Sequence, residues 1–315
     1  MRDVYQHVGE GVIAIDTEYV RPRMDASYLL IDEGRAAFVD VGTYFSVPNL
    51  LATLADQNLD VDAVDFILLT HIHLDHAGGA GRLAQALPRA KVLVHPRGAA
   101  HIVDPTLLVA ATKAVYGETR FIEEYGEIVA IPAERVETVE DGRHIELGHR
   151  RLEFMHTPGH ALHHVCIVDR DARVVFTGDT FGVSYRELDT AAGEFIFPTT
   201  TPSQFDPAQL HASIDRILET KLRHAYLTHY SRVGHVEKLG RDLHSDIDAC
   251  VAIARSAAGE ADPVERMKPL LFEHLSARLD RHGFRGGDSE RHAVLDGDIA
   301  LNAAGLHSWL SRRRA

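Results

Sequence analysis

The stretch THIHLDHAGG, residues 70–79, places three histidines and one aspartate within positions 71–76. The preceding residues 64–70, VDFILLT, form a short apolar run rich in strand formers and predict a buried strand. Residues 77–87 can form a helix, so the cluster is expected in the turn where a strand ends. Imidazole and carboxylate groups in such a turn suit zinc, iron or manganese. The alternative, a surface loop merely rich in histidine, is disfavoured by the density of ligands.

The spacing of these side chains points to two neighbouring metal ions. Alternate positions direct His71 and His73 to one side of the chain. The start of a helix at Asp75 and His76 can turn this second pair toward an adjacent point. One motif can therefore supply ligands to two metals.

Three later motifs each carry one further potential ligand, and each follows an expected strand. His160 ends the sequence TPGH at residues 157–160, Asp179 lies in FTGDT at 176–180, and His229 ends YLTH at 226–229. Together with His-x-His-x-Asp-His followed by Gly-Gly, this ordered set resembles the metallo-β-lactamase superfamily. The resemblance covers about residues 10 to 235.

The resemblance implies that two metals share seven protein ligands. These are His71, His73 and His160 for the first metal, Asp75, His76 and His229 for the second, and Asp179 as the bridge between them. The expected cofactors are two divalent transition metals, zinc foremost, with iron or manganese as alternatives. Asp75 is expected to be catalytic as well as a ligand, because it can orient a metal-bridging hydroxide and accept its proton.

The chemistry implied is hydrolysis, because a two-metal site lowers the pKa of bound water from about 16 toward about 7. The formal net charge of −13 argues against a nucleic-acid partner, since such partners need basic faces. The sequence therefore predicts a dinuclear metallohydrolase that acts on a small ester, thioester or lactone-type substrate.

Three other functions remain open. The first is an iron-dependent redox enzyme on the same fold, either a persulfide dioxygenase or a diiron oxygen or nitric-oxide reductase. The second is a metal-dependent phosphodiesterase. The third is a non-catalytic scaffold, which would be expected to have lost ligands, whereas all seven positions are filled.

Composition sets the compartment and the class of protein. The chain has 315 residues with 45% hydrophobic and 25% charged residues, which is typical of a globular protein. Two cysteines, Cys166 and Cys250, are too few for a disulfide framework and favour a reducing compartment. No apolar leader or run of about 18 apolar residues is evident, so we expect a cytoplasmic protein without a membrane span. The expected partner is a small-molecule substrate, and a homodimer remains an open alternative to a monomer.

The resemblance implies a fold of the α/β (α+β) class, a four-layer αββα sandwich, with a helical C-terminal extension. We expect a catalytic domain over residues 1–235 and a helical region over 236–315. Strands are expected at residues 11–15, 27–31, 36–40, 64–70, 91–96, 136–139, 151–155, 165–169, 173–176 and 225–228. Helical patterns are expected at 46–56, 77–87, 98–117, from Asp206-Pro207 onward, and at 236–257, 263–281 and 290–312. Glyoxalase II also has a helical C-terminal domain, but its glutathione-binding basic residues find no match here.

Several residues near the motifs have two possible roles. Tyr185, Arg186 and Tyr230 follow the ligand motifs and are candidate substrate-binding residues, with packing as the alternative. His163 and His164 either line the cleft or pack at a strand entry.

Three further positions are expected to be structural. Asp40 ends a strand and, by resemblance, supports from behind the loop over residues 70–79, called the metal loop below. It could equally be a turn residue. His95 precedes a proline at a strand exit and is expected not to bind metal. Ser46 is the candidate N-cap of the helix over 46–56.

Overall fold

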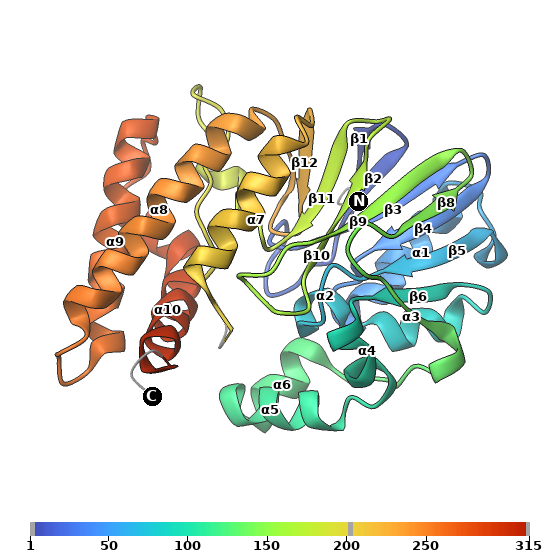
Figure 1. The fold of residues 1–315 in the computed structure, drawn as a ribbon, viewed down its shortest axis with the longest axis horizontal. Coiled ribbons are helices and arrows are strands. Elements are labelled where there is room, and N and C mark those ends of the chain that lie inside the picture. Colours follow the sequence, from blue (N-terminus) through green and yellow to red (C-terminus); the bar gives the residue numbers. More distant parts are fainter. Residues whose placement is uncertain (1–3, 201–203, 313–315) are drawn as a thin grey trace. The chain divides into compact units, whose positions relative to one another are not determined.

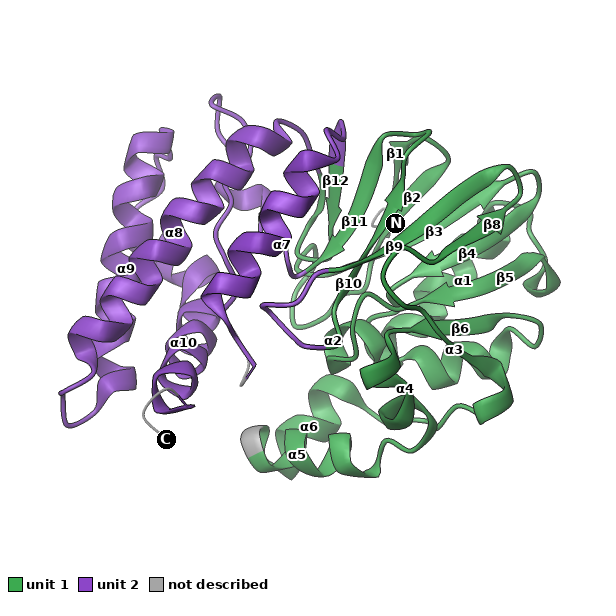
Figure 2. Cartoon of the chain, in the orientation of Figure 1, with its two compact units in different colours: residues 1–156, 163–178, 225–232 green, residues 157–162, 179–224, 233–315 purple. Residues whose placement is uncertain are grey.

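The computed structural model describes residues 4–200 and 204–312. Contacts divide the chain into two compact units, green and purple in Figure 2. Unit 1 runs to residue 156 and adds residues 163–178 and 225–232. Unit 2 takes residues 157–162, 179–224 and the chain from 233 onward. The chain therefore passes between the units several times, and the boundary expected at residue 235 stays a prediction.

A mixed sheet in unit 1 follows the chain in the order β1-β2-β3-β4-β5-β6-β7 (Figure 1). Its strands are β1 Tyr5–Gly9, β2 Val12–Asp16, β3 Ala26–Asp32, β4 Arg35–Val39, β5 Val64–Leu68, β6 Lys91–Val94 and β7 Val136–Thr138. Neighbours are antiparallel from β1 to β4 and parallel from β4 to β7. Central parallel strands are covered on both faces, which explains why Val64, Ile67 and Leu68 of β5 are all buried.

A second sheet, built almost wholly from unit 1, has the order β13-β12-β11-β10-β9-β8. Its strands are β8 His144–Leu147, β9 Arg150–His156, β10 Val165–Asp169, β11 Val174–Gly178, β12 His224–Leu227 and β13 Ser231–Val233. The pairs from β8 to β11 are antiparallel. Strands β10 and β11 are buried along their whole length, as their apolar sequences predict.

Aromatic side chains join the two sheets inside unit 1. The ring of Tyr28 in β3 lies 5.3 Å from that of Phe176 in β11 and 5.5 Å from that of Tyr226 in β12. The Tyr28 hydroxyl also donates to the carbonyl oxygen of Leu227. These contacts fix the ends of β3, β11 and β12 together, and the ligand motifs follow two of these strands.

The helices of unit 1 lie in the connections of the first sheet. They are η1 Tyr44–Ser46, α1 Val47–Asp56, η2 Val61–Ala63, α2 Leu74–Ala77, α3 Ala80–Ala86, α4 Pro96–Val103, α5 Thr106–Tyr116, α6 Glu118–Tyr125 and η3 Ala133–Arg135. Helix α1 packs on β2 and β3, α3 on β6 and α4 on β7. Leu50 and Leu54 of α1 enter the same core as Ile15 and Phe38 of the sheet. One face of this sheet is thus covered by helices, as parallel βαβ connections require.

Unit 2 is mainly helical. Its helices are η4 Arg186–Leu188, α7 Pro207–Glu219, α8 Val236–Ala257, α9 Pro263–His282 and α10 Asp288–Arg312. Helix α8 contacts α7, α9 and α10, and α10 also packs on α9. Asp206 and Asp262 cap α7 and α9 by accepting from backbone N–H groups three residues later, at 3.0 and 3.1 Å. Across residues 4–200 and 204–312, none of the helices is both long enough and apolar enough to cross a membrane.

The expected elements are confirmed except at a few places. Helix α8 has the expected limits, whereas the helical segment expected over 98–117 is two helices separated by Asp104-Pro105. Proline has no N–H to donate, which explains the break. Strands β1, β8 and β13 and helix α6 were not expected. Strand β1 lies at a sheet edge with mostly exposed side chains, so its sequence lacks the alternating apolar residues that predict a strand.

Ser46 stands at the N-cap position of α1, as expected, but its side chain makes no capping hydrogen bond to this helix. Its hydroxyl instead accepts from the N–H of Thr43 and donates to the carbonyl of Thr17, both at 3.1 Å. Thr43 caps the short η1 turn by accepting from the N–H of Phe45 at 3.3 Å. A 3₁₀ turn therefore precedes the α-helix and takes over the capping residues.

Candidate metal centre

The loop after β5 carries the densest group of potential ligands. Apolar Ile72 and Leu74 alternate with the ligands and are buried, which anchors the loop in the protein interior. A Cβ atom on Gly78 would lie 2.3 Å from the Leu74 carbonyl oxygen, and one on Gly79 would lie 2.4 Å from that of Thr43. Two glycines therefore end the motif because the backbone passes too close to its neighbours for any side chain.

Asp40, at the end of β4, holds this loop from behind. The buried carboxylate accepts from the N–H and the hydroxyl of Thr70, each at 2.8 Å, and from the Thr228 hydroxyl at 3.0 Å. Its Oδ2 also lies 2.9 Å from Nδ1 of His76. Asp40 thus joins the ends of β5 and β12 to the metal loop, in the supporting role that the resemblance implies.

Asp75, His76 and His229 form one group of potential ligands inside unit 1. Their ligand atoms lie within 4.8 Å of one another. Asp75 Oδ2 lies 3.7 Å from Nε2 of His76 and 3.6 Å from Nε2 of His229. The loops after β5 and β12 therefore bring together residues that are far apart in the sequence.

The other nitrogen of each of these histidines is held by the protein. Nδ1 of His76 faces Asp40, and Nδ1 of His229 lies 3.2 Å from the Met24 carbonyl oxygen and 3.6 Å from Oδ1 of Asp25. Burial raises the pKa of Asp25 to about 8, although the nearby His229 and His76 lower it. A metal-binding histidine usually has one nitrogen oriented in this way by a carboxylate or carbonyl. The arrangement therefore fits a divalent transition metal at the Nε2 atoms.

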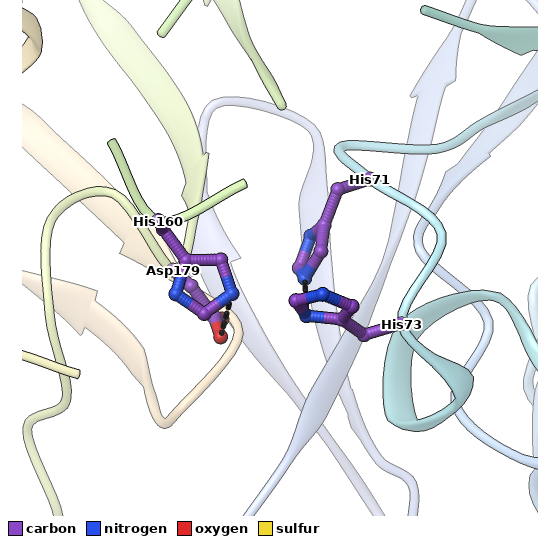
Figure 3. A group of neighbouring side chains, drawn as sticks. All are labelled: His71, His73, His160 and Asp179. Carbon is purple, nitrogen blue, oxygen red and sulfur yellow. Dashed lines mark hydrogen bonds and ion pairs between the residues drawn. The ribbon is translucent and has the colours of Figure 1, made fainter. Parts of the chain in front are cut away.

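Figure 3 labels four further potential ligands, of which His71 and His73 belong to unit 1 and His160 and Asp179 to unit 2. Within unit 1, Nε2 of His71 lies 2.8 Å from Nδ1 of His73, and the Thr70 hydroxyl lies 3.1 Å from Nδ1 of His71. Within unit 2, Nε2 of His160 lies 3.3 Å from Oδ2 of Asp179. Buried imidazole and carboxylate groups are the donor set that zinc, iron and manganese accept.

A glycine directly precedes both His160 and Asp179. Gly178, the last residue of β11, has φ +47°, and a Cβ there would lie 2.7 Å from Oγ1 of Thr70. Asp179 thus follows a strand end that passes directly against the metal loop. Gly159 has φ +127°, and a Cβ there would lie 2.3 Å from the backbone nitrogen of Leu210 in α7. Neither position can accept another residue without moving a ligand loop.

The candidate substrate-binding residues lie in packed surroundings. Tyr185 is fully buried, and its hydroxyl donates to Asp298 of α10 at 3.1 Å. Arg186 donates to the Ser184 carbonyl at 2.6 Å and pairs with Asp189 at 3.3 Å. Tyr230 is only 7% exposed. Their roles as substrate anchors stay predictions, and the contacts of Tyr185 favour packing.

The remaining histidines differ in their distance from the ligands. Nδ1 of His95 accepts from the N–H of Arg97 at 3.2 Å and so caps α4, and burial lowers the pKa of His95 to about 4. These contacts agree with the structural role expected for it. The ring of His164 lies 5.0 Å from that of His71, and the ring of His163 lies 5.5 Å from that of His73. Both therefore lie beside the metal loop.

Sequence reasoning missed two features of this centre. Asp25 lies in an irregular loop and has no motif around it, and only its contact with His229 reveals it. Burial, followed by the negative charge of Asp75, raises the pKa of three tyrosines from distant segments, Tyr19, Tyr116 and Tyr125. No spacing rule along the chain could have found either feature.

Comparison with known proteins agrees with this geometry. The family model described as the metallo-beta-lactamase superfamily matches residues 20–229. A metallo-beta-lactamase fold-containing protein of Sulfurisphaera tokodaii is 28% identical over 204 residues, 64% of this chain and 70% of its own length. The human acyl-coenzyme A thioesterase MBLAC2 is 28% identical over 56% of this chain and 65% of its own. A hydroxyacylglutathione hydrolase of Francisella tularensis subsp. novicida is 28% identical over 49% of this chain and 46% of its own.

Solved structures support the fold. The structure of a metallo-beta-lactamase family protein from Thermus thermophilus matches with a TM-score of 0.68 at 19% identity, covering 98% of this chain and 96% of that one. The archaeal superfamily protein from Sulfolobus tokodaii matches with a TM-score of 0.63 at 23% identity, covering 95% and 98%. The expected α/β sandwich fold with a helical C-terminal region is thereby confirmed.

Proposed function

The chain belongs to the metallo-β-lactamase superfamily, and from that premise we propose that it is a dinuclear metal-dependent hydrolase of a small ester, thioester or lactone. The observation that carries the proposal is the group of Asp75, His76 and His229 in unit 1, with His71 and His73 on the same loop. His160 and Asp179, which lie in unit 2, are the other two ligands proposed. Zinc is the metal proposed first, and iron or manganese would suit the same donors. A cytoplasmic location is part of the proposal, supported by the low number of cysteines, two, both of them buried.

The names of two relatives support hydrolysis of an acyl substrate. One is named as an acyl-coenzyme A thioesterase and the other as a hydroxyacylglutathione hydrolase. Each shares 28% of its residues with this chain over part of its length. The net charge of −13 adds a reason to prefer a small substrate to a nucleic acid.

When bound, the two metals would lower the pKa of water and act as Lewis acids toward the scissile carbonyl. The chain's own contribution begins with Asp75, whose side chain is 21% exposed and whose Oδ2 lies within 3.7 Å of the Nε2 atoms of both His76 and His229. An oxygen so placed can orient a water molecule and accept its proton. Asp40 keeps His76 and Thr70 in place, so the ligand loop does not have to reorganise during the reaction.

The proposal is tested by metal analysis and turnover on the same preparation. Protein loaded with zinc, iron or manganese in turn should bind about two ions per chain and hydrolyse a chromogenic ester or thioester. A control without metal should be inactive. Binding of one ion or fewer after reconstitution with each metal contradicts the dinuclear site. Oxygen consumption with a thiol or persulfide, without ester hydrolysis, would favour the redox alternative.

A further inference from the structure

Two histidines in unit 2 face each other across neighbouring helices. His211 lies on α7 and His244 on α8, two helices that pack against each other (Figure 1). Their side chains are 27% and 25% exposed, so both imidazoles can be reached from solvent. Neither histidine is one of the seven proposed ligands, and the proposed function gives them no role.

The register of the two helices brings these residues together. A Cβ atom on Gly240 would lie 2.7 Å from a side-chain carbon of α7, so the backbone of α8 comes close to α7 at this point. One turn further along α8, His244 faces Asp215, and one turn beyond that Asp248 faces His211. The helices are therefore antiparallel, and each offers the other one histidine and one aspartate, four residues apart on the same face.

The two imidazole rings meet through one nitrogen each. Nδ1 of His211 lies 2.6 Å from Nδ1 of His244. The ring planes are 9° apart, and the ring centroids are 4.9 Å apart. Because the nitrogens are much closer than the centroids, the rings lie edge to edge and both Nδ1 atoms point at one place. Two nitrogen lone pairs at this distance repel each other unless a positive ion lies between them.

Two carboxylates favour lone pairs on both of these Nδ1 atoms. Nε2 of His211 lies 3.3 Å from Oδ1 of Asp248, and Nε2 of His244 lies 3.1 Å from Oδ1 of Asp215. An ionised carboxylate only accepts hydrogen bonds, so it favours the tautomer that has its proton on Nε2. A neutral imidazole of this kind has its lone pair on Nδ1. Histidines that bind metal usually have their other nitrogen oriented in this way.

The donor atoms indicate the class of ion. Imidazole nitrogens suit zinc, nickel and copper, whereas calcium and magnesium prefer oxygen ligands. An ion that binds two nitrogens at about 2.0–2.1 Å, with its bonds at a right angle, needs them about 3 Å apart. A small rotation of the partly exposed rings opens their separation of 2.6 Å to this value. The negative charges of Asp215 and Asp248 favour a divalent cation beside them.

We propose that His211 and His244 bind one divalent transition-metal ion through their Nδ1 atoms, and that this ion links α7 to α8. The inference does not rest on the proposed hydrolase function. Helix α7 also supports the loop of His160, because the Ser213 hydroxyl donates to the Pro158 carbonyl oxygen at 2.6 Å. The ion would therefore brace the helix that holds this loop. The alternative is a single proton shared by the two nitrogens, with no metal bound.

The test counts the nickel ions bound by zinc-loaded protein. The protein is reconstituted with zinc, dialysed against zinc-free buffer at neutral pH to remove weakly held ions, and titrated with Ni²⁺ by calorimetry. Zinc and nickel are then measured by elemental analysis, so that exchange of zinc for nickel is recognised. The variants are His211→Ala and His244→Ala. His292→Ala is the matched control, because it removes another histidine of unit 2 that contacts an aspartate, Asp296 at 2.8 Å, but stacks on a phenylalanine.

We expect the wild type to bind one Ni²⁺ per chain in addition to the zinc it retains. His211→Ala and His244→Ala should each lose this ion, because the ion needs both nitrogens. Asp215→Asn and Asp248→Asn should each weaken Ni²⁺ binding by about tenfold, since the amide no longer holds the proton on Nε2 as firmly. His292→Ala should match the wild type. Circular dichroism checks that each variant is folded.

Absence of Ni²⁺ binding in the wild type overturns the inference and leaves the shared proton as the explanation. Equal binding in the wild type and in either His→Ala variant overturns it as well. The result is independent of the proposed function, because the difference between wild type and variant decides it. If the candidate metal centre retains no zinc, the wild type should still bind one nickel ion more than His211→Ala or His244→Ala.

Discussion

Asp40 and Asp246 are both buried carboxylates that hold two histidine-containing regions of the molecule, yet their surroundings differ. Asp40 accepts from the neutral groups of Thr70 and Thr228 and contacts His76, whose second nitrogen faces Asp75. Asp246 in α8 is bonded to His274 at 2.8 Å and to Arg278 of α9.

The difference lies in where each network ends. Arg278 also donates to the Ile196 carbonyl at 2.8 Å, so the network of Asp246 closes inside unit 2. Burial raises the pKa of Asp246, while His274 and Arg278 lower it. The network of Asp40 instead ends at a histidine aimed at a ligand group. Burial and charge alone therefore do not identify a functional carboxylate, whereas the direction of the next side chain does.

The largest expected effect comes from removing the proposed bridging ligand. Asp179→Ala should lower kcat/KM for a chromogenic ester by about 10³-fold, because the proposed bridging carboxylate would serve both metals. His95→Ala is the control, since His95 caps α4 and is not among the proposed ligands. Equal losses in two folded variants would mean that the ligand assignment is wrong.

Asp246→Ala should mainly affect stability. It leaves Arg278 and His274 without their buried carboxylate, which should cost about 3 kcal/mol of unfolding free energy. Urea unfolding followed by circular dichroism measures this, with Asp248→Ala, an exposed neighbour on α8, as control. The activity per folded molecule should stay at the wild-type level. A fall in kcat without a fall in the free energy of unfolding would contradict the purely structural role assigned to Asp246.

Asp40→Asn should mainly affect metal binding and change stability less than Asp246→Ala does. The amide keeps the shape but no longer offers two anionic oxygens to Thr70, Thr228 and His76, so metal affinity should fall by about 10- to 100-fold. Competition with a chromogenic chelator measures the affinity. In the absence of metal, the urea unfolding midpoint of Asp40→Asn should lie closer to the wild-type midpoint than that of Asp246→Ala. This result would confirm that the two carboxylates have different roles.

The smallest expected change is in the number of metal ions bound per chain. His229→Ala removes one imidazole from the group of Asp75 and His76 and leaves His71 and His73 in place. We expect about one ion per chain instead of about two, by elemental analysis after dialysis. His163→Ala is the control for loss of a nearby histidine outside the proposed ligands. Retention of both ions in His229→Ala contradicts the role of the last strand in the site.

Much of the fold was predictable because its signals are local. Strands β5, β10 and β11 are apolar runs, and helices α7 and α9 begin at aspartate followed by proline. The edge strand β1 was not predictable, because its pattern of exposure gives no apolar period. The break between α4 and α5 was missed because a helical period continues through Asp104-Pro105.

The sequence by itself determined the donor chemistry, since imidazole and carboxylate groups at these spacings have few other uses. Tertiary structure decided how the donors are supported and what surrounds them. Asp40 meets Thr228 across 188 positions, and Tyr19 meets Tyr125 across 106. Such contacts cannot be predicted from the local spacing of apolar residues, because they form only when separate strands and loops pack together. The sequence therefore predicts which residues are the potential ligands, whereas the contacts that hold their second nitrogens follow from the fold.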